Sequence, residues 1–425
     1  MSIAIVLIIV LIMLLVGFPL LTSFAFGAFG IIFALKPDMN MMFLVQQDIS
    51  GVSNFTLVAI PMFIFAADIM SFGLTANHLV DLIKSFCGHI HGGLAITVAG
   101  ACTLFGAISG SGNATVVAIG KPMRARMIDS GYDQQNTDAL ICSSATIATL
   151  IPPSINMIMY CILTGASIGE LFIAGIIPGL IVFLFFAVYN YFYARKHNTP
   201  RSERISFRGR LTVLRQTALA LGFPVLIVGG IYSGIFTPTE AAAASVFYAL
   251  VCEMLVYRTM GLKDLIAVAE NSAIMTSAIF ILIGMGQGFS WVIAYFDIPK
   301  AVTLAAMEHI HTQMGMAILI SIAFWIACML VDQIVAMVLL IPLVFPMASA
   351  MGMDPIYVGV LVCLQAAIGF ITPPFGSNIF VACAAFKRPY IEIVKGLPAY
   401  LIILFVISVI YIVFPDLALI YRAVL

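Results

Sequence analysis

The segment LFGAISGSGNATVVAIG, residues 104–120, interrupts an apolar run with glycines and small polar residues. Two glycines separated by one serine favour a turn, and the nearby hydroxyl and amide side chains offer oxygen ligands. Inside a membrane, a helix break is tolerated only where protein or trapped water satisfies the free backbone groups. We therefore expect the tip of a re-entrant helical hairpin, residues 93–121, although a small-residue helix-packing motif is the alternative.

The composition is that of a membrane protein. Of 425 residues, 63% are hydrophobic and only 9% are charged, and the mean hydropathy is +1.14. A soluble domain is roughly half apolar and a quarter charged, so a soluble globular protein is excluded. The 19 basic residues balance the 19 acidic residues, which argues against nucleic-acid binding. We predict an all-α polytopic membrane protein in the lipid bilayer, with roughly 13 to 16 spans or half-spans.

The amino terminus and the cysteines add little chemistry. Residues 1–35 contain no lysine or arginine, so we expect a membrane span there rather than a cleavable signal peptide. The eight cysteines are dispersed without a CxxC pair, which indicates neither a zinc site nor a disulfide framework.

A second break is indicated by TLIPPSIN, residues 149–156, which lies inside the apolar run 139–163. Neither proline has an N–H group, and each ring displaces the carbonyl four residues earlier, so the carbonyls of Ala148 and Thr149 should be freed. We predict a broken helix over residues 135–165, with a merely kinked helix as the alternative.

The second half of the chain has the same pair of features in MLVDQIVAM, residues 329–337, and GFITPPFGSN, residues 369–378. They predict a hairpin over 313–347 and a broken helix over 356–386, with the carbonyls near Gly369 and Phe370 freed. Asp332 is a carboxylate in a long apolar context, which indicates a functional site. A place at the water interface beside the hairpin mouth is the alternative.

These four breaks define the candidate site. Neutral oxygens suit sodium, whereas a proton path would need buried Asp, Glu or His, in which the breaks are poor. Helix amino termini at the breaks can hold an anionic group. The first-half candidates for binding sodium and substrate are Ser109, Gly110, Ser111, Gly112, Asn113, Thr115, Ala148, Thr149, Pro152, Pro153, Ser154 and Asn156. The second-half candidates are Asp332, Gln333, Gly369, Phe370, Thr372, Pro373, Pro374, Gly376, Ser377 and Asn378. We expect sodium as the coupling ion, no other metal and no cofactor.

The two halves match at an offset of 221, from Pro152 to Pro373 and from Gly131 to Gly352. The loop KPMRAR of the first half is basic, whereas its second-half equivalent is not. Because basic loops face the cytoplasm, the halves should have opposite orientations, and inverted repeats are typical of secondary transporters. We predict a first inverted repeat of scaffold helices, hairpin and broken helix over 1–192, a basic cytoplasmic connection over 193–215, and an equivalent second repeat over 216–425.

The segment TPTE, residues 237–240, has the pattern of a helix start, with a threonine cap, a proline in the first turn and a glutamate near the positive end of the helix dipole. Alternatively, Thr237, Thr239 and Glu240 lie at membrane depth beside the site. The sequence has no motif of an intramembrane protease, a lipid-phosphate transferase or a P-loop, so we expect a protein that is not an enzyme.

Several of these motifs together resemble a known family. GGIYSGIFTPTEAAA (229–243), SGSGNAT (109–115), IPPS (151–154) and TPPFGSN (372–378) are similar to the large membrane subunit (M, or DctM-like, subunit) of tripartite ATP-independent periplasmic (TRAP) transporters. The resemblance covers essentially the whole chain. It implies a sodium-coupled importer of the elevator type, in which a transport domain with two re-entrant hairpins and two broken helices slides against a scaffold domain.

The resemblance also implies where the ions bind and which partners are needed. Sodium sites are implied at the 109–115 tip with the first proline pair, and at Asp332–Gln333 with the second pair. The implied partners are a periplasmic substrate-binding protein and a small four-helix membrane subunit, which we expect to be separate because the sequence starts directly with the large subunit. The implied substrate is a carboxylate-bearing organic anion, with sialic acid favoured over a C4-dicarboxylate, and the implied location is the bacterial inner membrane.

Two alternatives stay open. Divalent-anion/sodium symporters share this plan without a binding protein, and SGSGNAT matches their Ser-Asn-Thr hairpin motif only in part. A non-transporting membrane scaffold subunit would have no use for the paired breaks.

Overall fold

The computed structural model describes residues 6, 9–10, 12–13 and 16–423, and every regular element among them is a helix. The expected amino-terminal span over 1–35 falls partly outside these residues. The first half contains α2 (Leu20–Leu35), α3 (Met42–Val52), η1 (Phe55–Val58), α4 (Ala59–Phe72), α5 (Thr75–Cys87), α6 (Gly93–Ser109), α7 (Gly112–Thr115), η2 (Val116–Gly120), α8 (Lys121–Asp129), α9 (Gln134–Ala145), η3 (Thr146–Thr149), α10 (Ile155–Thr164) and α11 (Ile168–Lys196).

The second half continues with helices of similar lengths. It contains α12 (Phe207–Pro224), η4 (Val225–Gly229), α13 (Gly230–Tyr232), α14 (Pro238–Leu250), η5 (Val251–Val256), α15 (Leu262–Tyr295), α16 (Ile298–Met307), α17 (Gln313–Leu330), α18 (Gln333–Ala350), α19 (Pro355–Gly369), α20 (Ser377–Phe386), α21 (Tyr390–Val394), α22 (Pro398–Val413), α23 (Asp416–Leu419) and η6 (Ile420–Ala423).

Many of these helices have the length and composition of membrane spans. In the described part of the chain, seven are long and apolar enough to cross a membrane, and the bent pair Pro398–Val413 with Asp416–Ala423 would add an eighth. Others, such as Gly93–Ser109 and Pro355–Gly369, are apolar but too short to cross alone. The prediction of an all-α polytopic membrane protein is confirmed.

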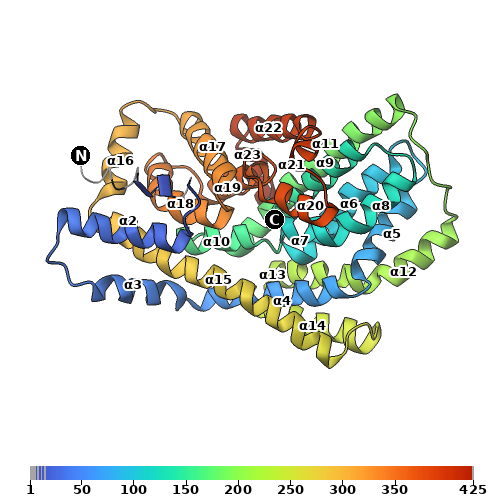
Figure 1. Ribbon diagram of the computed structural model, residues 1–425, viewed down its shortest axis with the longest axis horizontal. Helices are drawn as coiled ribbons and strands as arrows, with labels where there is room; N and C mark the ends of the chain where they lie inside the picture. Colours follow the sequence, from blue (N-terminus) through green and yellow to red (C-terminus); the bar gives the residue numbers. More distant parts are fainter. Residues whose placement is uncertain (1–5, 7–8, 11, 14–15, 424–425) are drawn as a thin grey trace.

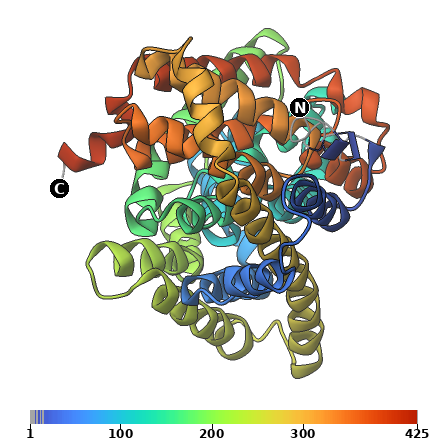
Figure 2. The same cartoon turned by 90° about the vertical axis from the view of Figure 1, so that its left-hand side faces the viewer.

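The helices form an outer layer and a central bundle. The outer layer consists of α2, α3, α4, α14 and α15, in which α15 packs on α2, α3 and α4 and α14 packs on α4. Figure 1 shows α3, α4, α14 and α15 together along one side of the molecule, next to the hairpins and broken helices of the central bundle, α6–α10 and α17–α20. In the view turned by 90° (Figure 2), the yellow-green and yellow helices at the start of the second half lie at the bottom, and the orange and red helices of its later part lie at the top.

The core lies in the central bundle. Every residue of α6 except Leu104, and every residue of α19 except Pro355, is buried. In contrast, only 10 of the 34 residues of α15 are buried. A helix that is apolar on all sides is stable only when protein or lipid surrounds it, so α6 and α19 require the surrounding bundle.

Each hairpin turns at a capped helix end. In the first, α6 ends at Gly110, whose φ of 59° places it in the left-handed region, and Ser111 accepts a hydrogen bond from the Ala114 N–H at the start of α7. In the second, Asp332 separates α17 from α18 and accepts from the Ile334 N–H at 2.9 Å.

The returning arms are longer than the sequence indicated. They end at Asp129 and Ala350, whereas we expected ends at 121 and 347. The first continues without a gap from α7 through the π-helical turn η2 into α8, with Pro122 directly after that turn. The second includes two prolines inside its helix.

Both proline pairs lie at helix breaks. The chain is non-helical between η3 and α10 at the first pair and between α19 and α20 at the second, and the bond joining the two prolines is cis in each pair. The preceding turns also correspond: Gly131 and Gly352 have φ angles of 81° and 71°. Asp133 and Asp354 then cap α9 and α19. Equivalent positions in the two halves therefore have equivalent local structure.

The basic connection predicted over 193–215 includes the ends of two helices. Helix α11 continues to Lys196 and α12 starts at Phe207, so the non-helical part of the connection is 197–206. Ser206 caps α12 by accepting from the Gly209 N–H at 3.2 Å, and Asn198 has a φ of 49°, which helps to end the preceding helix.

A buried carboxylate ties one end of the central bundle together. Asp138 of α9 is 1% exposed and accepts from Arg124 Nε of α8 at 2.5 Å. The Nε of Arg388, which follows α20, lies 3.4 Å from the other carboxylate oxygen. Asp138 thus connects the arm of the first hairpin to both broken helices.

Candidate functional site

A cavity of about 230 Å³ lies where the hairpin tips, the breaks and α15 meet. We call it the central cavity. It is lined by Gly110, Ser111 and Asn113 of the first tip, Thr149, Ile155 and Asn156 of the first break, Asp332, Gln333 and Ile334 of the second tip, Phe370 of the second break, and Met275, Ala278, Ile279 and Leu282 of α15. Segments from both halves therefore converge on one space.

The first hairpin packs directly on the first break. A Cβ added to Gly110 would lie 1.9 Å from the carbonyl oxygen of Pro153, and one added to Gly106 would lie 2.5 Å from the Cα of Ala148. Only glycine permits such approaches. The tip is braced internally, since the Ser109 and Thr115 hydroxyls lie 3.2 Å apart and Thr115 donates to the Ser111 carbonyl at 2.8 Å.

The second hairpin packs on the second break in a similar way. A Cβ added to Gly369 would lie 2.4 Å from the Cβ of Cys328 on α17. Trp325, on the same arm, donates from Nε1 to the Thr372 hydroxyl at 3.3 Å. Each half therefore contributes a hairpin fixed against its own broken helix.

Two buried amide side chains each contact the other half of the chain. The sequence-based assignment placed each of them in the site of its own half. Asn156, which we assigned to the first-half site, donates to the side-chain oxygen of Gln333 on the second hairpin. Asn378, which we assigned to the second-half site, donates to the carbonyl of Cys142 at 3.1 Å. The reason is that α20 packs on α7 and α9, so its first turn lies beside the first hairpin tip and not beside Asp332.

Two buried amide oxygens near the first tip have no hydrogen-bond donor. Among the described residues, Oδ1 of Asn113 and Oδ1 of Asn378 are buried and have no hydrogen-bond partner. A Cβ added to Gly112 would lie 3.1 Å from Asn378 Oδ1 and 3.3 Å from the Ala145 carbonyl oxygen. Buried acceptors without donors are costly unless a ligand satisfies them, and neutral oxygens of this kind are ligands for a hard cation.

The backbone carbonyls at the breaks are partly engaged. Thr149 accepts from the Ser154 hydroxyl at 2.7 Å, Gly369 accepts from the Thr372 N–H at 3.1 Å, and Phe370 accepts from the Asn378 N–H at 3.1 Å. We expected these carbonyls to be free. Instead, donors that follow each break form hydrogen bonds to these carbonyl oxygens. Each oxygen keeps one free lone pair.

Eight of the predicted site residues line the central cavity, namely Gly110, Ser111, Asn113, Thr149, Asn156, Asp332, Gln333 and Phe370. The others lie outside its lining: Ser109, Gly112, Thr115, Ala148, Pro152, Pro153, Ser154, Gly369, Thr372, Pro373, Pro374, Gly376, Ser377 and Asn378. The two breaks also differ in solvent exposure: Pro152 and Pro153 are buried, whereas Pro374 and Phe375 are exposed.

The structure does not bring Thr237, Thr239 or Glu240 to the cavity. Thr237 and Glu240 form a reciprocal capping box at the start of α14, with the Thr237 N–H donating to the glutamate at 2.8 Å. Both side chains are exposed. The structure therefore favours the helix-cap interpretation of the motif over a place beside the cavity.

Sequence reasoning missed the α15 wall of the cavity, together with Ile155 and Ile334 next to predicted residues. Met275, Ala278, Ile279 and Leu282 are ordinary apolar residues in a long apolar helix. No break, charge or unusual spacing distinguishes them in the sequence, and only packing reveals their position.

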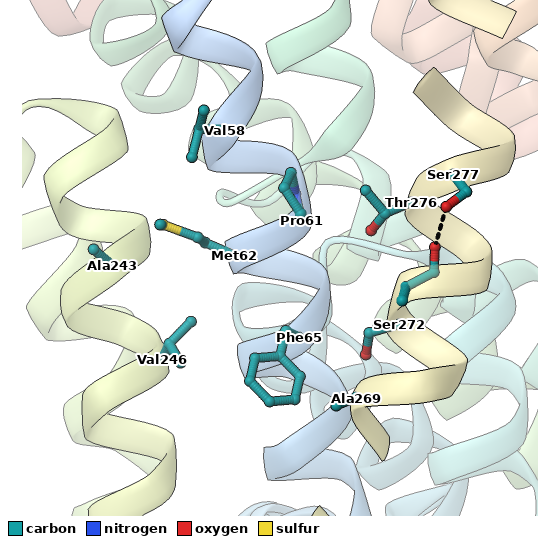
Figure 3. A pocket seen from close by; sticks show the side chains of 11 residues that line it. Val58, Pro61, Met62, Phe65, Ala243, Val246, Ala269, Ser272, Thr276 and Ser277 are labelled. Atoms are coloured by element: carbon teal, nitrogen blue, oxygen red, sulfur yellow. Dashed lines mark hydrogen bonds between the residues drawn. The ribbon is translucent and has the colours of Figure 1, made fainter. Parts of the chain in front are cut away.

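A second, larger hollow of about 610 Å³ lies between α4, α14 and α15. Figure 3 shows Met62 and Phe65 of α4 facing this groove, with Ala243 and Val246 of α14 on one side and Thr276 and Ser277 of α15 on the other. The Ser277 hydroxyl is already bonded to the Ala273 carbonyl at 2.8 Å. The groove has no charged lining residue and none of the predicted site residues, so it offers little to a charged substrate.

The class of protein follows from this construction. Paired hairpins and broken helices around a cavity with polar groups at the hairpin tips, in a multi-pass helical protein, are typical of secondary transporters. The chain belongs to the DctM component family of the tripartite ATP-independent periplasmic transporters, because the model of that family matches residues 7–417. It is therefore a large permease subunit of the inner membrane, and its relatives are transporter subunits and not enzymes.

Two relatives are similar over almost the whole chain. The ectoine/5-hydroxyectoine TRAP transporter large permease protein UehC of Ruegeria pomeroyi is 47% identical over 97% of this chain and 96% of that protein. The ectoine TRAP transporter large permease protein TeaC of Halomonas elongata is 46% identical over 96% of each. Neither of these two is named for sialic acid or a dicarboxylate.

One solved structure is similar in fold alone. The YdaH transporter of Alcanivorax borkumensis aligns with a TM-score of 0.61 and 13% identity, covering 88% of this chain and 89% of that chain.

Proposed function

We propose that this chain carries a small zwitterionic solute of the ectoine type into the cell, coupled to sodium, with solute and ions bound at the central cavity and the adjoining first tip. The observation that carries this proposal is the charge of the cavity. Among its lining residues there is one carboxylate, Asp332, and there is no lysine, arginine or histidine.

This charge pattern favours a zwitterion over a dianion. A dicarboxylate would bring two negative charges close to Asp332 without a basic side chain to balance them, and like charges repel strongly where water is excluded. A zwitterion has no net charge, so it needs no basic side chain to balance it, and it can present its carboxylate to the backbone N–H groups of a hairpin tip while Asp332 binds sodium. The names of the two relatives agree with this substrate class.

Sodium is proposed as the coupling ion because of the oxygens around the tips. The partnerless Oδ1 atoms of Asn113 and Asn378, with the Ala145 carbonyl beside Gly112, offer neutral ligands at the first tip. Asp332 offers a charged oxygen at the second. The family resemblance implies a sodium site near each tip, and these oxygens support two such sites.

We propose an elevator mechanism, in which the central bundle moves as a unit against the outer layer. The close contacts of Gly110 with Pro153 and of Gly369 with Cys328 support a bundle that moves without opening internally. The two inverted repeats predicted from the sequence would supply the two alternative positions.

The proposed partners complete the tripartite system. A periplasmic binding protein would deliver the solute, and a small four-helix membrane subunit would accompany this chain. Sialic acid, favoured by the sequence resemblance, and C4-dicarboxylates are the competing substrates. A divalent-anion symporter that needs no binding protein and a scaffold without transport are the competing functions.

The test is uptake into proteoliposomes that contain this chain and its small subunit. Radiolabelled ectoine, sialic acid and succinate are compared, with and without the binding protein, under an inward sodium gradient or a proton gradient alone. We expect ectoine uptake that needs both sodium and the binding protein. Uptake of succinate or sialic acid but not ectoine would overturn the substrate class, and uptake driven by protons alone would overturn the coupling.

A further inference from the structure

The central cavity has one wall without any polar side chain. Met275, Ala278, Ile279 and Leu282 form it, and their spacing along α15 places them on one face of a single helix. The hairpin tips on the other sides contribute hydroxyl, amide and carboxylate groups. The cavity is therefore amphipathic, with an apolar wall from α15 and polar side chains from the tips.

This wall belongs to the outer layer. Helix α15 approaches α3 closely at two glycines, since a Cβ on Gly288 would lie 1.9 Å from Asp48 Oδ1 and one on Gly284 would lie 3.1 Å from the Asp48 carbonyl oxygen. Helix α15 also contacts α18 of the second hairpin. The wall is thus fixed to one layer while the polar groups come from the other.

Within the wall, Ala278 is the smallest residue. Its neighbours on the same face, Met275 and Leu282, are long side chains that fill space. A larger residue at position 278 would reduce the room in a cavity of about 230 Å³, and a polar residue there would add the only hydrogen-bonding group to the wall.

We infer that this face of α15 recognises the hydrocarbon part of the substrate and that Ala278 determines how bulky and how polar that part can be. The inference rests on the proposed function, because it concerns a small cyclic zwitterion. Ectoine has a carboxylate and an amidinium on part of its ring and two ring methylenes elsewhere. 5-Hydroxyectoine differs by a hydroxyl on one of those methylenes.

The pair of compounds therefore probes the wall directly. An added substrate hydroxyl finds no partner on an apolar wall, whereas a serine at 278 could bond to it. One hydrogen bond between neutral groups changes relative uptake by about threefold to tenfold. Because one binding protein delivers both compounds to every variant, its own preference cancels when variant and wild type are compared.

The experiment measures competitive sodium-driven uptake of ectoine and 5-hydroxyectoine by the complete three-component system. Ala278→Ser should shift the uptake ratio toward 5-hydroxyectoine by about threefold to tenfold. Ala278→Leu should reduce uptake of both compounds, and of the hydroxylated one more. The matched controls are Ala273→Ser and Ala273→Leu, which alter the α15 face that lines the groove of Figure 3 and should leave the ratio unchanged.

A second variant keeps the inference testable if Ala278→Ser fails to fold. Met275→Ser, one turn earlier on the same wall, should shift the ratio in the same direction. If both serine variants still take up substrate with an unchanged uptake ratio, the role of the wall is overturned. Equal losses of uptake for both compounds would indicate only a structural defect, and this result would also contradict the role of the wall. If the wild type transports neither compound, the proposed function fails first, and this inference fails with it.

Discussion

The side-chain amide of Asn156, which follows the first break, donates a hydrogen bond to the side-chain oxygen of Gln333 at the tip of the second hairpin. The two residues are 177 positions apart, and they are 6% and 4% exposed. Both line the central cavity. The contact therefore joins the two halves of the chain at the place where we propose that the substrate binds.

Removing one partner of this bond should be harmful. Asn156→Leu leaves the Gln333 oxygen buried without a donor, which costs about 1–3 kcal/mol. We expect a lower thermal midpoint and reduced uptake. The double variant Asn156→Leu/Gln333→Leu removes both polar groups and should recover part of the lost stability, and strictly additive effects in this cycle would contradict the coupling.

The contact of Gly110 with Pro153 predicts a second effect. Gly110→Ala adds a Cβ that would collide with the Pro153 carbonyl, at a residue with φ of 59°. We expect about 1–3 kcal/mol of overpacking strain beyond the penalty of the left-handed backbone, together with loss of uptake. Gly165→Ala is the matched control, because Gly165 has φ of 74° but no atom within 4 Å of the added Cβ. Equal losses in both variants would show that the backbone angle alone is responsible.

Asp332 should control the response to sodium. Replacing it by asparagine removes the single negative charge in the cavity lining, so we expect the half-saturating sodium concentration for uptake to rise about tenfold or more, which corresponds to about 1.4 kcal/mol. Asp332→Glu should keep part of the sodium response. Asp38→Asn, in the exposed loop between α2 and α3, is the control. An unchanged sodium titration for Asp332→Asn would contradict its assignment to the ion site.

The carboxylate of Asp138 should matter for stability. Asp138→Asn leaves the half-buried Arg124 and Arg388 without their shared buried partner, and losing hydrogen bonds to a charged group in this way costs about 1–3 kcal/mol. The exposed pair Arg126–Asp81, at 3.4 Å, is the comparison, and its loss should cost at most about 1 kcal/mol. Thermal unfolding of the purified membrane complex measures the effect of Asp138→Asn and of a variant that lacks the Arg126–Asp81 pair. Equal midpoints for these two variants would contradict the role of Asp138 in holding the central bundle together.

Local breaks could be predicted from the sequence because they depend on a few residues with strong backbone preferences. The proline pairs 152–153 and 373–374 cannot continue a helix, and Gly110 permits a left-handed turn. The helix ends were less predictable, since the first hairpin arm continues through the π-helical turn η2 into α8 and ends at Asp129.

Contacts between distant segments could not be predicted in the same way. The repeat suggested that each amide stays with its own half, yet Asn156 bonds to Gln333 and Asn378 lies beside the first tip. The α15 wall gives no sequence signal, because Ala278 differs in no local respect from other small residues of that helix. These features depend on how the outer layer packs against the central bundle.

The central claim, that sodium and a small zwitterion cross together at this cavity, is tested most directly by measuring labelled sodium and labelled ectoine entry in the same proteoliposomes. The complete wild-type system should admit sodium only when ectoine and the binding protein are present, and Asp332→Asn should reduce both fluxes together at low sodium. Ectoine accumulation without sodium entry, or sodium entry that ignores ectoine, would contradict the account.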